Sequence, residues 1–115
     1  MRVLVIEDNA LVAFDVADML SRAGFEVIGP ATTLDEGVRL LDTTSPDGAI
    51  LDIDIGRSST TFEVARRLLK EGKRIIFLSG YSEEVRPLPE DLRAVPRLTK
   101  PYDRFEVMEE FARLI

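Results

Sequence analysis

The sequence contains neither cysteine nor histidine. The absence of cysteine excludes disulfide bonds and thiol catalysis, and the absence of both residue types excludes the usual zinc sites. Without histidine the chain has no imidazole that could act as a general base. Any chemistry in this chain must therefore use carboxylates, hydroxyl groups, lysine or arginine.

The chain also lacks a long apolar run and an excess of positive charge. The first residues turn acidic at Glu7, far short of a signal-peptide core or a membrane span, so we expect a cytoplasmic protein without membrane contact. The formal net charge is −6. An acidic protein repels phosphate backbones, so we expect no direct binding to nucleic acid.

The chain does contain enough apolar residues for one core. Hydrophobic residues make up 45% and charged residues 31% of its 115 residues, as in ordinary globular proteins. This length suits one compact domain and is too short for two. We therefore expect a single domain over residues 1–115.

Short apolar runs alternate with amphipathic segments along the chain. Such runs are typical of strands covered on both faces of a parallel sheet, and apolar residues spaced three and four apart are typical of helices. Only short helical turns are expected in the fourth helical segment, because Pro87, Pro89 and Pro96 remove amide donors there. The pattern predicts an α/β fold, a doubly wound, five-stranded parallel sheet of the (βα)5 type. The expected strands cover 3–6, 25–31, 49–51, 74–78 and 97–99.

Polar side chains follow four of these strands. Glu7 and Asp8 end the first strand, Asp52 ends the third, Ser79 the fourth and Lys100 the fifth. Ligands of doubly wound sheets bind beyond the carboxyl ends of the strands, near the point where the strand order reverses. Folding should therefore bring these five residues into one crevice.

Three carboxylates in one crevice repel each other and must share protons, pair with Lys100 or hold a cation. A hard divalent ion fits best, and oxygen ligands select Mg²⁺, which binds through one or two carboxylates together with phosphate. Asp52 could then act as a nucleophile toward phosphorus. Lys100 would neutralise charge on the transferring oxygens, and Ser79 would donate a hydrogen bond.

Four segments together resemble the receiver domains of bacterial two-component response regulators. They are VLVIED at 3–8, ILDID at 50–54, IFLSGY at 76–81 and LTKPY at 98–102, and their order and spacing are close to the family pattern. The resemblance covers the whole chain. It implies a flavodoxin-like fold with strand order 2-1-3-4-5, and a phosphoacceptor signalling domain rather than an enzyme.

The same resemblance implies roles for individual residues. Asp52 would take a phosphoryl group from a histidine kinase or a phosphotransfer protein, which agrees with the absence of histidine from this chain. Glu7, Asp8, Asp52 and the backbone carbonyl of Asp54 would bind Mg²⁺. Phosphorylation would switch the binding of a downstream protein or of a second copy of the chain. The cognate kinase and the target depend on surface contacts that have no chemical signature in the sequence.

The chain departs from the family pattern at the position three residues before the lysine. Receivers often carry an aromatic residue there that reports phosphorylation to the surface, whereas this chain has Arg97. Tyr81, two residues after Ser79, resembles a subgroup of stand-alone receivers and could substitute as the moving ring. We also expect the acidic side chain of Asp54 to alter attack of water on the acyl phosphate. The proline-rich segment 82–96 is expected to reorder on phosphorylation.

Two apolar surfaces have alternative interpretations. Leu11 and Phe14 on the first helix are either core or a contact surface for a partner. In the last helix, Phe105, Met108, Ala112 and Ile115 are expected to face the sheet. The same helix has a second apolar stripe, made of Val107, Phe111 and Leu114. This stripe is more consistent with core packing than with a dimer contact.

Other functions remain open from the sequence. Asp52 and Asp54 also resemble the Asp-x-Asp motif of haloacid-dehalogenase-type phosphatases, but that family has a second acidic pair after its lysine, whereas here Glu7 and Asp8 come first. A degenerate receiver that only binds proteins is disfavoured, because all five site residues are present. The chain is consistent with a stand-alone receiver and with one from a longer protein.

Overall fold

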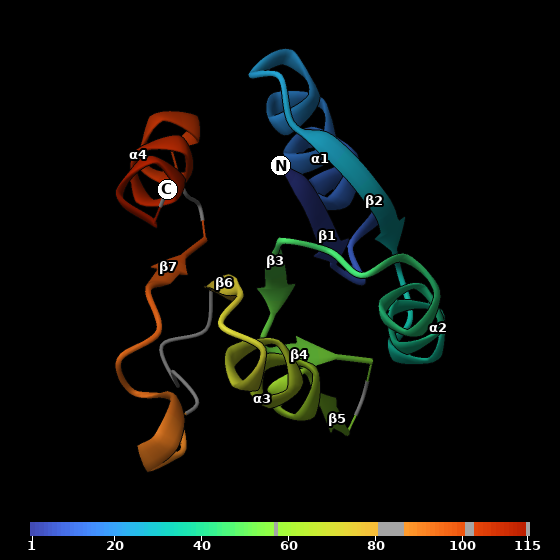
Figure 1. The fold of residues 1–115 in the computed structure, drawn as a ribbon, viewed down its shortest axis with the longest axis vertical. Coiled ribbons are helices and arrows are strands. Elements are labelled where there is room, and N and C mark those ends of the chain that lie inside the picture. Colours follow the sequence, from blue (N-terminus) through green and yellow to red (C-terminus); the bar gives the residue numbers. More distant parts are fainter. Residues whose placement is uncertain (57, 81–86, 101–102, 115) are drawn as a thin grey trace.

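The structure is a computed structural model and describes residues 1–56, 58–80, 87–100 and 103–114. Five strands form one parallel sheet (Figure 1): β1 (Arg2–Ile6), β2 (Glu26–Ala31), β3 (Gly48–Asp52), β6 (Arg74–Ser79) and β7 (Arg97–Thr99). Their order is β2-β1-β3-β6-β7. This is the predicted order 2-1-3-4-5, and the doubly wound α/β fold is confirmed.

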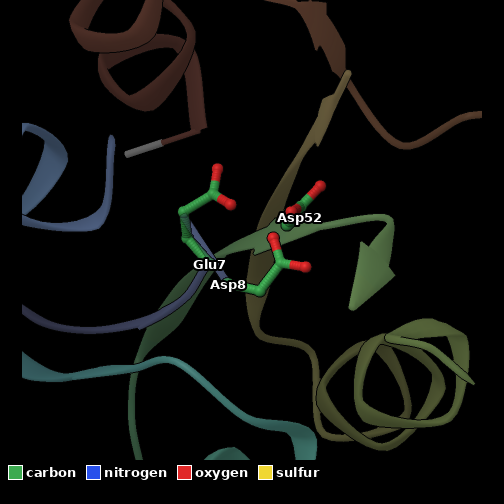
Figure 2. Close-up of side chains that lie close together, drawn as sticks. All are labelled: Glu7, Asp8 and Asp52. Atoms are coloured by element: carbon green, nitrogen blue, oxygen red, sulfur yellow. The ribbon is translucent and has the colours of Figure 1, made fainter. Parts of the chain in front are cut away.

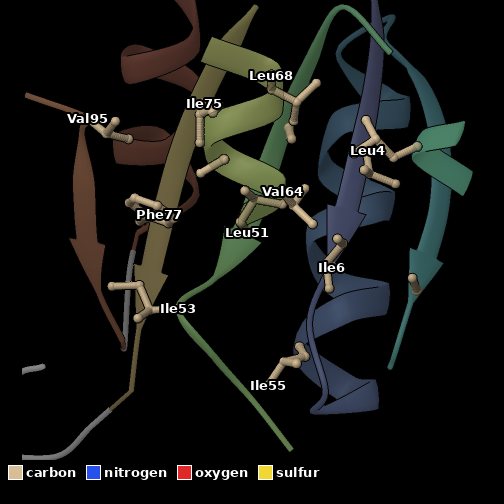
Figure 3. Packing of buried hydrophobic residues seen from close by; sticks show 14 of the residues in the cluster. Leu4, Ile6, Leu51, Ile53, Ile55, Val64, Leu68, Ile75, Phe77 and Val95 are labelled. Atoms are coloured by element: carbon tan, nitrogen blue, oxygen red, sulfur yellow. The ribbon is translucent and has the colours of Figure 1, made fainter. Parts of the chain in front are cut away.

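The central strands are buried on both faces because their apolar side chains alternate between two cores. On β1, Leu4 and Ile6 face one core, whereas Val3 and Val5 face the other. Figure 3 shows the first core, in which Leu51 of β3 and Phe77 of β6 also lie. The continuous apolar runs in the sequence are thus explained by a sheet with two covered faces.

Helices cover both faces of the sheet. On one face lie α2 (Leu34–Thr44) and α3 (Phe62–Lys70), which contribute Leu41, Val64 and Leu68 to the first core. The other face is covered by α1 (Ala10–Arg22) and α4 (Arg104–Leu114). α1 begins after Asn9, whose side chain accepts hydrogen bonds from the backbone amides of Leu11 and Val12, as expected of a helix cap.

The prediction for the last helix was wrong for most of the stripe expected to face the sheet: Met108 packs against the second core as predicted, but Phe105 and Ala112 do not. Val107 and Phe111 are fully buried in the second core, whereas Phe105 is 71% exposed and Ala112 is also exposed. Ile115 lies outside the described residues. Both stripes have helical spacing, so periodicity alone cannot choose between them. Because Val107 and Phe111 are core residues, they do not offer a dimer surface.

The segment before β7 carries only a short turn of 3₁₀ helix in its described part. This turn, η1 (Glu90–Leu92), follows Pro87 and Pro89, and Leu92 is buried against the first core. The expectation of an irregular fourth helix is therefore confirmed for residues 87–96. Residues 81–86, where the proposed reordering would begin, lie outside the described residues.

A small antiparallel hairpin after β3 was not predicted from the sequence. It consists of β4 (Asp54–Ile55) and β5 (Ser59–Thr60) and precedes α3. Ile55 is buried in the first core, which ties the hairpin to the sheet. In the part of the chain that the structure describes, no helix has the length and apolar character needed to span a membrane.

Candidate functional site

The carboxyl ends of β1 and β3 bring three acidic side chains together. Ile6 pairs with Leu51, so Glu7 and Asp8 leave β1 beside Asp52 at the end of β3. One carboxylate oxygen from each of the three lies within 4.8 Å of the others. Figure 2 shows the three side chains gathered at this edge of the sheet. Glu7 and Asp52 are buried, whereas Asp8 is exposed, so the cluster is open to solvent on one side.

Lys100 closes the buried side of the cluster. It follows β7, and its backbone amide donates to the carbonyl of Ser79, 3.0 Å away, next to the register pair of Ser79 and Thr99. The Lys100 ammonium pairs with Glu7 Oε1 and lies 3.6 Å from Asp52 Oδ2. The buried Lys100, which follows β7, is therefore paired with carboxylates from the ends of β1 and β3.

The surroundings of Asp52 disfavour its charged form. Burial and then the hydrogen bond and charge of Glu7 raise the pKa of Asp52 to about 9, against the opposing effect of Lys100. Burial alone would lower the pKa of Lys100, but its hydrogen bond to Glu7 and the charge of Asp52 raise it instead. Without a further cation, a proton is therefore retained within this cluster at neutral pH.

Asp8 is held in its charged form by the hairpin. Its Oδ2 accepts a hydrogen bond from the backbone amide of Gly56 at 3.0 Å. Burial is the largest single influence and opposes ionisation, but this backbone hydrogen bond, the hydrogen bonds with Asp52 and Glu7 and the charge of Lys100 together lower the pKa of Asp8. The connection between β3 and α3 thus supports an exposed carboxylate that could serve as a ligand.

Thr61 supports the backbone of Asp52 and was not identified from the sequence. Its side chain is fully buried, and its Oγ1 donates to the carbonyl oxygen of Asp52 at 2.7 Å. Its backbone amide donates to the carbonyl of Ile53. Thr61 precedes α3, so the sequence marks it as a helix-cap residue, yet its side chain makes no cap hydrogen bond. Its location beside Asp52 depends on the intervening hairpin.

The remaining predicted residues lie around this cluster. Ser79 is buried at the end of β6, one residue after Leu78, which pairs with Asp52. The Ser79 hydroxyl accepts a hydrogen bond from Arg97 Nε at 3.4 Å. Asp54 lies in β4 with an exposed side chain. Tyr81 lies outside the described residues, so its role stays a prediction.

The family model described as response regulator receiver domain matches residues 3–112. The chain belongs to this family. Receiver domains are signalling domains of two-component response regulators, and this match covers the site residues Glu7, Asp8, Asp52, Ser79 and Lys100. The resemblance stated from the sequence is thereby confirmed.

The receiver domain is similar to named regulators. It is 34% identical over 104 residues to the transcriptional regulatory protein PdtaR of Mycobacterium tuberculosis, with coverage of 88% of this chain and 50% of PdtaR. It is 28% identical over 118 residues to the chemotaxis protein CheY of Treponema pallidum, with coverage of 99% and 82%. The chain therefore spans about half the length of PdtaR.

The solved structures agree on the fold of the receiver domain. The solution structure of SdrG from Sphingomonas melonis Fr1 superimposes with a TM-score of 0.84 at 24% identity and covers 99% of this chain and 95% of SdrG. The signal receiver domain of a modulated diguanylate cyclase from Desulfovibrio desulfuricans G20 gives a TM-score of 0.81 at 28% identity, with coverage of 99% and 92%. Neither these structures nor the two regulators support the phosphatase alternative.

Proposed function

We propose that this receiver domain accepts a phosphoryl group on Asp52 from a histidine kinase or a phosphotransfer protein and that acceptance changes its binding to a downstream protein. The observation that carries the proposal is the packing of Asp52 against two further carboxylates and Lys100. Charged groups gathered at the end of a sheet suit the transfer of a group that is itself highly charged.

The transfer follows from these groups. The ionised Asp52 carboxylate attacks phosphorus, an oxygen–phosphorus bond forms, and the phosphorus–nitrogen bond of the donor phosphohistidine breaks. The imidazole leaves with the electron pair of that bond, and the product on this chain is an acyl phosphate. Lys100, already 3.6 Å from Asp52 Oδ2, offsets charge on the phosphoryl oxygens. Ser79 at the end of β6 donates a hydrogen bond to one of them.

The acidic cluster fits a divalent cation. Its ligand atoms are all oxygen, one carboxylate is open to solvent, and the three carboxylates outnumber the Lys100 ammonium, which pairs with two of them. We propose that Glu7, Asp8, Asp52 and the backbone carbonyl of Asp54 hold Mg²⁺. When bound, Mg²⁺ supplies positive charge that favours ionised Asp52 and the phosphoryl oxygens. Asp8, held by the Gly56 amide, is the most accessible of the carboxylates.

We propose that the phosphodonor docks on the exposed apolar side chains of α1. Leu11 is 83% and Phe14 is 64% exposed, and both lie on the helix that begins directly after the acidic end of β1. Exposed apolar side chains next to a site are a contact surface for a protein partner. We also propose a cytoplasmic location and a single receiver domain over residues 1–115, as expected from the sequence.

Docking on α1 predicts that changes to this surface affect the rate with a kinase donor but not the rate with a small-molecule donor. The double variant Leu11→Ser, Phe14→Ser should lower the rate of phosphotransfer from the kinase about tenfold or more, because anchoring apolar contacts are lost. The rate with acetyl phosphate should stay unchanged, because that donor needs no docking. Both rates are measured by phosphoprotein gel, with Leu69→Ser on α3 as a matched exposed control. Equal loss with both donors would contradict a docking role.

The experiment that tests acceptance is intact-protein mass spectrometry after incubation with acetyl phosphate and Mg²⁺. Wild type should gain one phosphoryl group per chain, Asp52→Asn should gain none, and Asp35→Asn on α2 should behave as wild type. Phosphorylation of Asp52→Asn to the wild-type level would overturn the assignment. A phosphatase would instead release product continuously from a small phosphate ester, which the same protein preparation tests directly.

A further inference from the structure

Arg97 occupies the position of the missing aromatic residue and contacts Ser79. The two residues lie on neighbouring strands, with Phe77 paired to Arg97 and Ser79 paired to Thr99. Arg97 Nε donates to Ser79 Oγ at 3.4 Å, and Arg97 is half-buried. Its Nη2 is fully buried and has no hydrogen-bond partner among the described residues. A buried guanidinium nitrogen without a hydrogen-bond partner is costly.

The direction of this hydrogen bond determines how the Ser79 hydroxyl is used. A guanidinium has only donors, so Ser79 Oγ must accept with one of its lone pairs. The hydroxyl hydrogen of Ser79 is then directed away from Arg97 and is free to donate elsewhere. A cationic donor also polarises the hydroxyl and strengthens the bond that the hydroxyl donates.

The hydroxyl and Asp52 lie close in the fold. Ser79 is the residue after Leu78, whose register partner is Asp52, and the Leu78 carbonyl accepts from the amide of Ile53. Burial lowers the pKa of Arg97, and the negative charge of nearby Asp54 opposes this effect. Arg97 therefore hydrogen-bonds the hydroxyl at the end of β6 and lies within reach of the charge of Asp54.

We propose that Arg97 is a positioning residue for phosphoryl transfer, which orients and polarises the Ser79 hydroxyl so that it donates to a phosphoryl oxygen on Asp52. The inference rests on the proposed function and adds a residue to it. With acetyl phosphate as donor, the Asp52 oxygen–phosphorus bond forms, the phosphorus–oxygen bond to acetate breaks, and acetate leaves. The Ser79 proton stays on its oxygen throughout, and no bond of Arg97 is made or broken.

The test is a double-mutant cycle on the rate of phosphorylation by acetyl phosphate at saturating Mg²⁺. Arg97→Met should lower the rate about 3- to 10-fold, as expected for loss of one oriented hydrogen bond. Ser79→Ala should lower it by a similar factor, and the double variant should be no slower than Ser79→Ala. Arg97→Lys should recover part of the rate, because an ammonium also donates. Arg93→Met, an exposed arginine near η1, is the matched control and should equal wild type.

The outcomes separate this inference from the proposed function. A wild-type rate for Arg97→Met, or factors for Arg97→Met and Ser79→Ala that multiply in the double variant, would overturn the positioning role while acceptance on Asp52 stands. A wild-type protein that gains no phosphoryl group would overturn the proposed function and this inference together. If Arg97→Met does not fold, as judged by circular dichroism, Arg97→Gln replaces it, because its amide retains a donor and fills similar space. Arg97→Gln should then retain a higher rate than Ser79→Ala, and a rate equal to that of Ser79→Ala would overturn the role.

Discussion

At the scale of single residues, three carboxylates lie in a small space beside one ammonium group. Asp52 is buried next to Glu7, and both face Lys100 rather than water. Asp8 is the exposed member, and its charge is held by a backbone amide. The chemistry proposed for Asp52 thus depends on Glu7 and Asp8 after β1, Ser79 at the end of β6 and Lys100 after β7.

Asp54 lies two residues after Asp52 and has an exposed carboxylate. A carboxylate near an acyl phosphate can accept a proton from the attacking water, so Asp54→Asn should lengthen the lifetime of the phosphorylated protein several-fold. The decay is followed by mass spectrometry after the donor is removed, with Asp35→Asn as control. An unchanged or faster decay would refute this role for Asp54.

At the scale of elements, the β4–β5 hairpin links the acceptor strand to α3. Thr61, at the end of this hairpin, donates to the Asp52 carbonyl from a fully buried position. The hairpin also supplies the Gly56 amide that contacts Asp8. One connection therefore contacts both the backbone of Asp52 and the carboxylate of Asp8.

Thr61→Val should lower the free energy of unfolding by about 1–3 kcal/mol, because it removes a buried hydrogen bond without changing the side-chain volume much. It should also slow Mg²⁺-dependent phosphorylation, because the backbone after Asp52 is less well held. Urea unfolding and the acetyl phosphate assay measure the two effects. Thr43→Val, whose hydroxyl bonds within α2, is the control. Normal stability of Thr61→Val would show that the hydrogen bond contributes little.

The two aromatic residues of α4 should differ sharply in their contribution to stability. Phe111→Ala should lower the free energy of unfolding by about 3–5 kcal/mol, because a fully buried ring leaves a cavity. Phe105→Ala should change it by less than about 0.5 kcal/mol, because that ring is exposed. Urea denaturation of both variants checks the orientation of the helix. Equal costs would contradict it.

The α4 result shows where sequence reasoning reached its limit. The strands could be predicted because buried parallel strands are continuous apolar runs, and β7 was predicted with the bounds that the structure has. The exposed face of α4 could not be predicted, because Phe105 and Phe111 both lie on stripes of helical spacing. The hairpin was missed because strands of two residues have no periodicity. The charged residues of the site were found because strand ends converge, but Thr61 was not, because its contact is with a backbone atom.

At the scale of the whole molecule, the sheet separates two cores while the charged cluster lies at its edge. Burial of Asp52 therefore affects the free energy of unfolding of the whole chain. Its pKa is about 9 in the folded chain and 3.8 in the reference state, so the folded chain binds a proton that the unfolded chain has already lost between these values. The stability contribution of this group is present at low pH and is lost as pH rises.

Without divalent cation, the free energy of unfolding should therefore fall between about pH 5 and pH 9, by at most about 1.4 kcal/mol per pH unit from Asp52. Asp8 and Asp91, whose pKa values are lowered, change the free energy of unfolding only at acidic pH. Lys100, whose pKa is raised, changes it only at alkaline pH. Urea unfolding in a chelator measures the slope, which Asp52→Asn should flatten. A slope that persists in Asp52→Asn would place the proton elsewhere.

The distribution of the site along the chain has a consequence for synthesis on the ribosome. Glu7 lies at the end of the first strand and Lys100 after the last strand of the sheet, and the ammonium of Lys100 offsets the buried charge of Glu7. A nascent chain that has emerged only through β6 holds the acidic residues without their counter-charge. The charged cluster is thus complete only after β7 and Lys100 have emerged from the ribosome.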